Sequence, residues 1–244
     1  GIVRITALLP VAADWWGGTT LTVGAITGVA GIAFAIGQTD IKRLIAYTSI
    51  SHFGFITLGI FALTSQGQSG STLYMVNHGL STAALFLVAG FLMSRRGSKF
   101  IDDFGGIVKV APLLAGLFLV AGLSSLALPG MGSFISEFLV LVGTFVKYPI
   151  VAVIATSGIV LAALYVLWLY QRTMTGPLKP GCEGVTDATG REVVAVAPLV
   201  ALIIALGVFP APVLNVINPA VNQTLAAVGV QDPQVGVNAG GEGQ

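Results

Sequence analysis

The stretch LPGMGSFISEFLVLVGTF, residues 128–145, places one acidic side chain inside an otherwise uncharged run. It opens with Pro129, Gly130 and Gly132, which disfavour a continuous helix because proline lacks a backbone N–H and glycine is conformationally free. Glu137 follows shortly after these residues. The sequence therefore predicts two helical halves separated by a break, with a carboxylate early in the second half.

The composition places this stretch in a membrane. The chain has 244 residues, of which 55% are hydrophobic and 9% are charged, and its mean hydropathy is +0.93. Soluble domains carry roughly 25% charged residues, so most of the surface is expected to face lipid. The net charge of +1 gives no indication of a nucleic-acid partner. We predict an all-α polytopic membrane protein.

Residue types typical of catalytic and cofactor sites are scarce in this chain. The single cysteine, Cys182, cannot by itself hold an iron–sulfur cluster, a zinc ion or an internal disulfide. We find no nucleotide-binding fingerprint, metal-ligand spacing or catalytic triad. We therefore expect no catalytic, cofactor-binding or metal-binding residues here, and expect any linked redox chemistry to take place on another polypeptide.

The hydrophobic pattern divides the chain into three parts. A membrane-spanning helix needs about 20 mostly apolar residues. Uncharged or nearly uncharged runs occur at 20–37, 44–64, 72–94, 110–128, 133–146, 149–170 and 193–214. The expected domains are the end of a preceding helix with an outer loop at 1–19, a membrane domain at 20–214 and a polar, loosely ordered tail at 215–244. The opening GIVRITALLP resembles the tail of a helix already under way, which suggests a fragment.

The distribution of basic residues decides how many times the chain crosses the membrane. If 110–146 is one broken span, nine basic residues fall on one side and two on the other; two full spans would give seven and four. The stronger bias favours one broken span and six transmembrane helices in all. The nine are Lys42, Arg43, Arg95, Arg96, Lys99, Lys109, Arg172, Lys179 and Arg191. We expect this side to be cytoplasmic, with both chain ends on the outer side of a bacterial cytoplasmic membrane.

Three titratable side chains, Glu137, His52 and His78, lie within the apolar runs. Ionisable groups are costly inside a bilayer and usually face the bundle interior or a hydrated path. A neutral imidazole can accept a proton on one nitrogen and donate from the other, which suits a relay. The alternatives are a structural acid at the break and histidines that hydrogen-bond between helices. By depth along the helices, His78 is expected nearer the outer side than His52.

Three segments resemble the antiporter-like subunits of respiratory complex I, namely QTDIKRLIAYTSISHFGFITLGI, NHGLSTAALFLVAGFL and LPGMGSFISEFLVLVGTF. The glutamate on the broken helix resembles subunit M, the ND subunit four type, and the resemblance covers its C-terminal half. It implies a fold of about fourteen helices with two inverted repeats, each containing a discontinuous helix. This chain would then hold the end of helix eight and helices nine to fourteen.

The resemblance also implies a function, namely proton translocation driven by electron transfer from NADH to quinone in other subunits. Glu137 matches the family's terminal acid, His52 and His78 match histidines of its central hydrophilic axis, and Lys42 matches a lysine at the cytoplasmic start of a helix. NADH, FMN, iron–sulfur clusters and quinone would all lie on other subunits. Expected partners are the other membrane subunits, especially neighbouring antiporter-like ones, and the lipid bilayer.

Two other functions remain open from the sequence. One is the D-type subunit of a multisubunit Na⁺/H⁺ antiporter, which transports ions without a redox partner. The other is a structural membrane anchor, in which Glu137 would affect assembly and leave coupling intact. The joint occurrence of Glu137, His52 and the helix break favours the translocating subunit of an NADH:quinone oxidoreductase.

Overall fold

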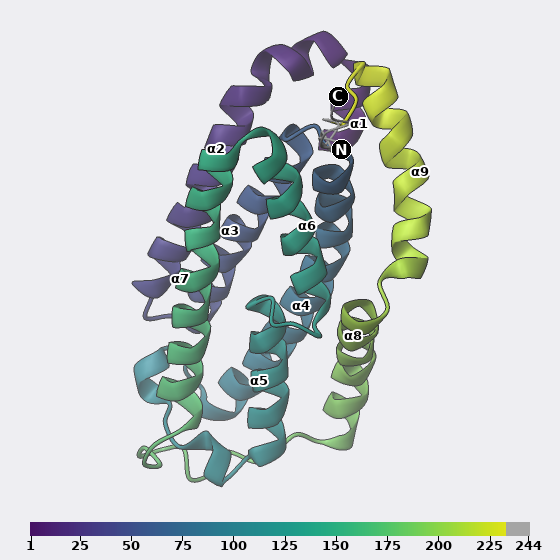
Figure 1. Cartoon of the computed structure of the whole chain (residues 1–244). Helices are drawn as coiled ribbons and strands as arrows, with labels where there is room; N and C mark the ends of the chain where they lie inside the picture. Colours follow the sequence, from purple (N-terminus) through teal and green to yellow (C-terminus); the bar gives the residue numbers. More distant parts are fainter. Residues whose placement is uncertain (233–244) are drawn as a thin grey trace, which may run out of the picture.

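Helices make up most of the part of the chain that the computed structural model describes, residues 1–232. Nine α-helices and two short 3-10 helices follow one another along these residues (Figure 1). Their bounds are α1 Ile2–Leu8, α2 Pro10–Ile36, α3 Ile41–Phe61, α4 Ser65–Arg96, η1 Ile101–Asp103, η2 Ile107–Lys109, α5 Pro112–Ser125, α6 Gly132–Lys147, α7 Pro149–Met174, α8 Gly190–Val208 and α9 Ala211–Val228.

Five of these helices, α2, α3, α4, α7 and α8, are long and apolar enough to cross a membrane. Local sequence fixes several of their ends. Asp40 caps α3 by accepting from the backbone N–H groups of Lys42 and Arg43, and Thr64 caps α4 through Gly67. At the other end of α4, Gly97 adopts a left-handed conformation, with φ of 72°, that ends the helix.

The broken helix is confirmed. α5 and α6 follow one another in the same column of the bundle, with an irregular segment between them (Figure 1). Within that segment Ala127 and Gly130 have positive φ angles of 56° and 94°, which turn the chain out of the helical path. Together with the five continuous helices, α5 and α6 complete the six expected crossings.

Two of the expected boundaries differ from the structure. Only Leu9 separates α1 from α2, which begins at Pro10, so the predicted outer loop at 1–19 is largely helix. The predicted tail at 215–244 also contains most of α9. Ile217, Val221 and Leu225 recur every four residues and pack with Leu73 of α4, so burial of this apolar stripe stabilises α9. Residues 233–244 of that tail lie outside the described part.

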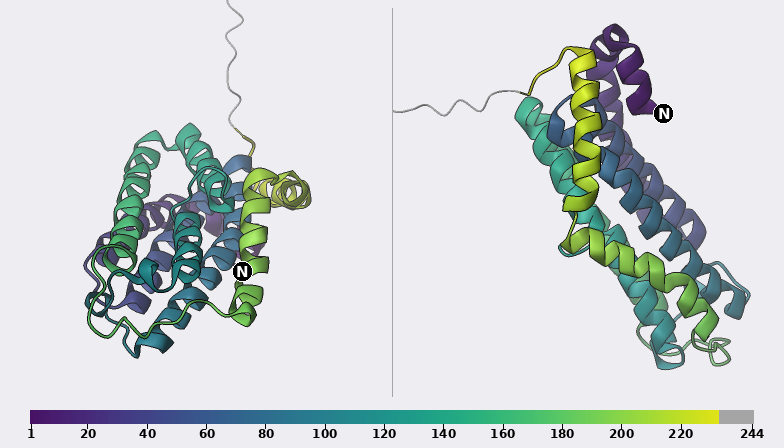
Figure 2. Two further views of the ribbon diagram at one scale, coloured as in Figure 1. Left: turned by 90° about the horizontal axis from the view of Figure 1, so that it is seen from below. Right: turned by 90° about the vertical axis from the view of Figure 1, so that its right-hand side faces the viewer.

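The helix ends divide the bundle into two chemically different ends. At the lower end in Figure 1, α2, α4 and α7 end and α3, α5 and α8 begin, and the helix ends and loops there carry the nine basic residues named above. We call this the basic end. The opposite end holds α1, the starts of α2, α4 and α7, and the end of α6 (Figures 1 and 2).

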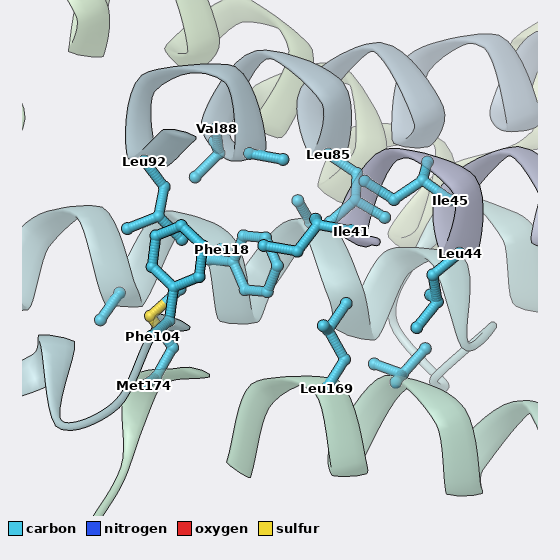
Figure 3. Packing of buried hydrophobic residues seen from close by; sticks show 14 of the residues in the cluster. Ile41, Leu44, Ile45, Leu85, Val88, Leu92, Phe104, Phe118, Leu169 and Met174 are labelled. Atoms are coloured by element: carbon cyan, nitrogen blue, oxygen red, sulfur yellow. The ribbon is translucent and has the colours of Figure 1, made fainter. Parts of the chain in front are cut away.

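The main apolar core lies toward the basic end. Figure 3 shows Ile41 and Ile45 of α3, Leu85, Val88 and Leu92 of α4, Phe118 of α5 and Leu169 of α7 packed around one another. Phe104, from the segment between η1 and η2, is fully buried in the same cluster. This core joins the first half of the broken helix to α3, α4 and α7, and so positions the polar groups at the break.

The loop between α7 and α8 supports the start of α5. The Asp187 carboxylate accepts from the N–H groups of Leu113 and Leu114 at 3.0 and 2.8 Å. Burial disfavours the ionised form of Asp187 and by itself would raise the pKa of this group. The two hydrogen bonds, a third from the backbone N–H of Ala188 and the nearby positive charge of Arg95 outweigh burial, so the pKa of Asp187 is lowered. The loop therefore supplies the cap that the sequence before α5 lacks.

Candidate functional site: a hydrogen-bonded chain at the broken helix

Glu137 lies in the second turn of α6, just after the break, and is only 6% exposed. Its Oε1 accepts a hydrogen bond from the hydroxyl of Tyr74 on α4. Tyr74 is fully buried. Because a hydrogen bond to an ionised group is stronger than one between neutral groups, Tyr74 stabilises the carboxylate form of this acid.

Tyr74 also connects Glu137 to His52 on α3. The Tyr74 hydroxyl lies 2.5 Å from His52 Nδ1, whereas His52 Nδ1 and Glu137 Oε1 are 3.8 Å apart. The direct distance is too long for a hydrogen bond. The tyrosine hydroxyl is therefore the link between the imidazole and the acid.

The row of polar groups continues on the far side of His52. Its Nε2 lies 3.3 Å from the hydroxyl of Ser125, the last residue of α5, and this hydroxyl lies 3.4 Å from that of Tyr165 on α7. Ser125 and Tyr165 are 3% and 2% exposed. Five buried side chains from five helices thus form one row, which we call the relay chain: Tyr165, Ser125, His52, Tyr74 and Glu137.

The donors in the relay chain all point the same way when Glu137 is ionised. Tyr74 gives its only hydroxyl proton to Glu137, so the proton between Tyr74 and His52 belongs to Nδ1. A neutral His52 then accepts at Nε2 from Ser125, and Ser125 accepts from Tyr165. Protonation of Glu137 permits the reverse order throughout. A set of bonds with two such orders can pass a proton along its length.

His78 lies beside the relay chain and not within it. Its ring centroid is 4.9 Å from that of His52, and its Nδ1 lies 3.1 Å from the hydroxyl of Thr82. Phe53 packs edge-on against the same ring at 5.4 Å. The two histidine rings therefore pack against each other, and the expectation that His78 is nearer the opposite end stays a prediction.

The residues predicted to break the helix lie where the sequence places them. Pro129 and Gly130 are in the segment between α5 and α6, and Gly132 is the first residue of α6. Asn77 of α4 donates to the Gly132 carbonyl and to the Ser136 hydroxyl, both at 2.7 Å. A Cβ at Gly132 would lie 2.5 Å from Asn77 Oδ1, so the absence of a side chain permits this close contact.

Lys42 is not brought to the relay chain. It lies in the first turn of α3, exposed at the basic end, and ten residues of helix, about 15 Å, separate it from His52. Its role in a relay stays a prediction.

Three members of the relay chain, Tyr74, Ser125 and Tyr165, were not predicted from the sequence. Tyrosine and serine are common in membrane helices, so neither residue type signals a site. One signal was available, since Tyr74 precedes His78 by four residues and such residues share a helix face. Ser125 and Tyr165 carry no comparable signal, because only the packing of α5 and α7 around His52 brings them together.

The fold and the site together define a class of polytopic membrane proteins with buried, hydrogen-bonded titratable groups at a discontinuous helix. Residues 1–162 match the model of the family described as NADH:quinone oxidoreductase/Mrp antiporter, transmembrane. The chain belongs to this family.

Individual relatives agree with this assignment. The chain is 57% identical over 226 residues to NADH-quinone oxidoreductase subunit M of Mycobacterium tuberculosis, covering 93% of this chain and 41% of that protein. It is 39% identical to NADH-quinone oxidoreductase subunit M of Rhodobacter capsulatus, covering 91% and 44%. The chain thus spans about two fifths of the length of these relatives.

Solved structures support the fold. Respiratory complex I from Thermus thermophilus with bound NADH contains a chain that matches with a TM-score of 0.84 and 31% identity, covering 89% of this chain and 46% of that one. The Mrp complex from Dietzia sp. DQ12-45-1b matches with a TM-score of 0.82 and 20% identity, covering 93% and 52%. The second match shows a shared fold alone.

Proposed function

We propose that this chain translocates protons as part of a membrane subunit of a bacterial NADH-quinone oxidoreductase of the subunit M type. The observation that carries the proposal is the relay chain, which joins Glu137 to four further buried groups at the break of a membrane helix. A purely structural acid would need a partner at the break, but it would not need a continuous row across five helices.

In the proposed mechanism a proton moves along the relay chain by exchange of hydrogen bonds. A proton taken up by the Tyr165 hydroxyl replaces the one that Tyr165 passes to Ser125. Ser125 in turn passes its own proton to His52 Nε2, His52 passes its Nδ1 proton to Tyr74, and Tyr74 passes its hydroxyl proton to Glu137. Each of the first three contacts spans at most 3.4 Å between heavy atoms. Glu137 then holds the proton until a change in its surroundings releases it. His78, beside His52, would respond to the charge on that ring.

The energy for repeated transfer comes from outside this chain. Moving one charge against 100 mV costs about 2.3 kcal/mol, and no contact among the described residues supplies this in every cycle. We propose that electron transfer from NADH to quinone, through FMN and iron–sulfur clusters on other subunits, supplies it. The neighbouring antiporter-like subunits are the proposed partners that transmit the conformational or electrostatic change, and Lys42 is the proposed group at the basic end.

The charge distribution supports an orientation. Nine basic residues lie in the loops and helix ends of the basic end, and Arg4 and Lys147 lie toward the opposite end. By the positive-inside rule we propose that the basic end is cytoplasmic. Both ends of this chain would then lie on the outer side of the cytoplasmic membrane.

The antiporter alternative has weaker support. The family description names both kinds of complex, but the 57% identity is to an oxidoreductase subunit and the match to an Mrp complex has 20% identity. The two proposals differ in their energy source. Proton movement that requires NADH and quinone supports the oxidoreductase subunit, whereas Na⁺-driven movement without NADH supports the antiporter.

The test uses the complex that contains this chain, in sealed membrane vesicles, with Glu137→Gln. Glutamine keeps the size of the side chain and removes its titratable carboxyl group. Glu183→Gln, in the exposed loop between α7 and α8, is the matched control. We expect fewer protons moved per NADH in Glu137→Gln and no change in the control. Normal proton movement in an assembled Glu137→Gln complex would refute the role of Glu137.

A further inference from the structure

We propose that Asn77 of α4 is a positioning residue, which fixes the first turn of α6 so that the Glu137 carboxylate meets the Tyr74 hydroxyl. Both amide protons of Asn77 go to groups of α6 outside the relay chain, so this side chain acts through the backbone of α6. The inference rests on the proposed function for its purpose, but the surroundings of Glu137 can be measured without turnover.

The first observation is that α4 contacts the start of α6 at two adjacent points. Tyr74 and Asn77 are three residues apart and are therefore neighbours on the surface of α4. Tyr74 donates to Glu137. Asn77 Nδ2 gives one proton to the Ser136 hydroxyl and the other to the Gly132 carbonyl, each at 2.7 Å. The amide therefore holds the turn that comes directly before the acid.

The second observation is that the remaining close contacts between α4 and α6 lie farther along α6. A Cβ at Gly70 of α4 would lie 2.8 Å from the backbone nitrogen of Val140. A Cβ at Gly143 of α6 would lie 2.7 Å from Gly67 Cα. These glycines bring the two backbones together at the later turns of α6. At the first turn, the hydrogen bonds of Asn77 join α6 to α4.

The third observation is a steric contact between α8 and the segment before α6. A Cβ at Gly207 of α8 would overlap the Gly130 carbonyl oxygen and would lie 2.6 Å from the Met131 carbonyl carbon. Such a contact limits how closely two elements approach, but it does not hold them together. The hydrogen bonds from Asn77 therefore keep the first turn of α6 against α4.

The fourth observation concerns the other atom of the amide. Asn77 is 2% exposed, and within residues 1–232 its Oδ1 is one of four buried side-chain atoms without a hydrogen-bond partner. A buried acceptor that stays unpaired costs free energy, whereas an apolar side chain of similar size avoids this cost. Packing alone would therefore favour leucine at this position. The two donated hydrogen bonds are what asparagine adds.

The position of Glu137 depends on this turn because Glu137 directly follows Ser136 in α6. Hydrogen bonds weaken steeply as their length and angle depart from the optimum. A shift of the first turn away from α4 would therefore weaken the bond between Tyr74 and Glu137, although neither of these residues had changed. Asn77 thus sets the geometry of the last contact in the relay chain.

The experiment uses the intact complex with two test variants and a matched control for each. Asn77→Leu keeps the size of the side chain and removes both donors. Its control is Gln68→Met, which removes another buried amide of α4, one that donates to α3. Gly132→Ala leaves the amide in place but puts a Cβ 2.5 Å from Asn77 Oδ1, which displaces it. Its control is Gly116→Ala on α5, where a Cβ would meet no other atom within 4 Å.

The first measurement is the infrared band of the Glu137 carboxyl group, assigned by its loss in Glu137→Gln. Tyr74→Phe defines how the band moves when Glu137 loses its hydrogen-bond partner. We expect Asn77→Leu and Gly132→Ala to move the band in the same direction and both controls to leave it at the wild-type position. If Asn77→Leu does not assemble, Gly132→Ala decides. An unmoved band in an assembled test variant overturns the proposal.

The second measurement is NADH-driven proton uptake in sealed vesicles. Asn77→Leu alone should slow uptake about tenfold, the change in rate that corresponds to one lost hydrogen bond. Added to Tyr74→Phe, it should slow uptake no further, because the contact that it positions is already absent. Additive slowing would indicate a general structural role and overturn the proposal. A shifted band with wild-type proton uptake would support the positioning of Glu137 by Asn77 and refute the proposed function of Glu137 instead.

Discussion

Tyr74→Phe removes the group that joins His52 to Glu137 and tests whether protons pass through it. The substitution keeps the ring and removes one hydroxyl, so the core of α4 stays filled. It leaves His52 Nδ1 and Glu137 Oε1 facing each other across 3.8 Å, beyond hydrogen-bond distance. Glu137 also loses the bond donated to its carboxylate.

The size of the effect follows from those two losses. A hydrogen bond to a charged group contributes about 1.5–3 kcal/mol, and about 1.4 kcal/mol corresponds to a tenfold change in rate. Proton transfer between His52 and Glu137 should therefore slow by about 10- to 100-fold. If proton transfer between His52 and Glu137 limits turnover, the coupled reduction of quinone slows. If electron transfer continues without this proton transfer, fewer protons move per NADH.

The assay measures NADH oxidation by quinone and proton uptake together in sealed vesicles. NADH oxidation by a water-soluble acceptor serves as the check that the electron-transfer subunits are intact. Tyr47→Phe is the matched control, because Tyr47 lies on α3 and packs against Phe34, away from the relay chain. If Tyr74→Phe keeps the wild-type rate of NADH oxidation and the wild-type number of protons per NADH while Glu137→Gln is defective, Tyr74 is not on the proton path.

Two further substitutions test the packing around the relay chain. Gly54→Ala should destabilise the bundle by about 1–3 kcal/mol because its Cβ would lie 2.6 Å from the Gly24 carbonyl oxygen and 2.7 Å from Gly28 Cα, both backbone atoms of α2. A Cβ added at Gly90 would meet no other atom within 4 Å, so Gly90→Ala should not destabilise the bundle. Equal melting temperatures for the two variants would refute the close approach of α3 to α2 at Gly54. Asp187→Asn should lower the melting temperature at pH 7, since it weakens the cap of α5. Because the folded pKa of Asp187 is depressed, its stabilisation is present above the ordinary value of 3.8 and is lost as the pH falls below it; a wild-type advantage that persists at lower pH would contradict this.

The membrane fold and the break are predictable from the sequence for clear physical reasons. A carboxylate in an uncharged run and a Pro-Gly segment before it both violate local rules for a continuous membrane helix, and such violations stand out against an apolar background. Glu137 and the break are found in this way, and His52 is found because histidine is rare in apolar runs. The basic residues at the loops then indicate the number of crossings.

Prediction fails where several helices meet or where the pattern is amphipathic. α9 escapes detection because Asn215, Asn218 and Asn222 interrupt its apolar run, although its apolar residues recur at helical spacing. Asp14 interrupts the apolar pattern before residue 20, but α2 continues through it from Pro10. Ser125 and Tyr165 belong to the site only through the packing of α5 and α7 around α3.

The single donor direction of the relay chain has a consequence for timing. Once a proton has passed from Tyr165 to Glu137, every hydroxyl has turned and His52 has exchanged its tautomer. A second proton cannot follow in the same direction until each of these groups rotates back. In the proposed mechanism the relay chain must therefore be reset after each proton, and this reorientation, at the buried rings of Tyr74 and His52, would set an upper limit on the rate of repeated proton transfer.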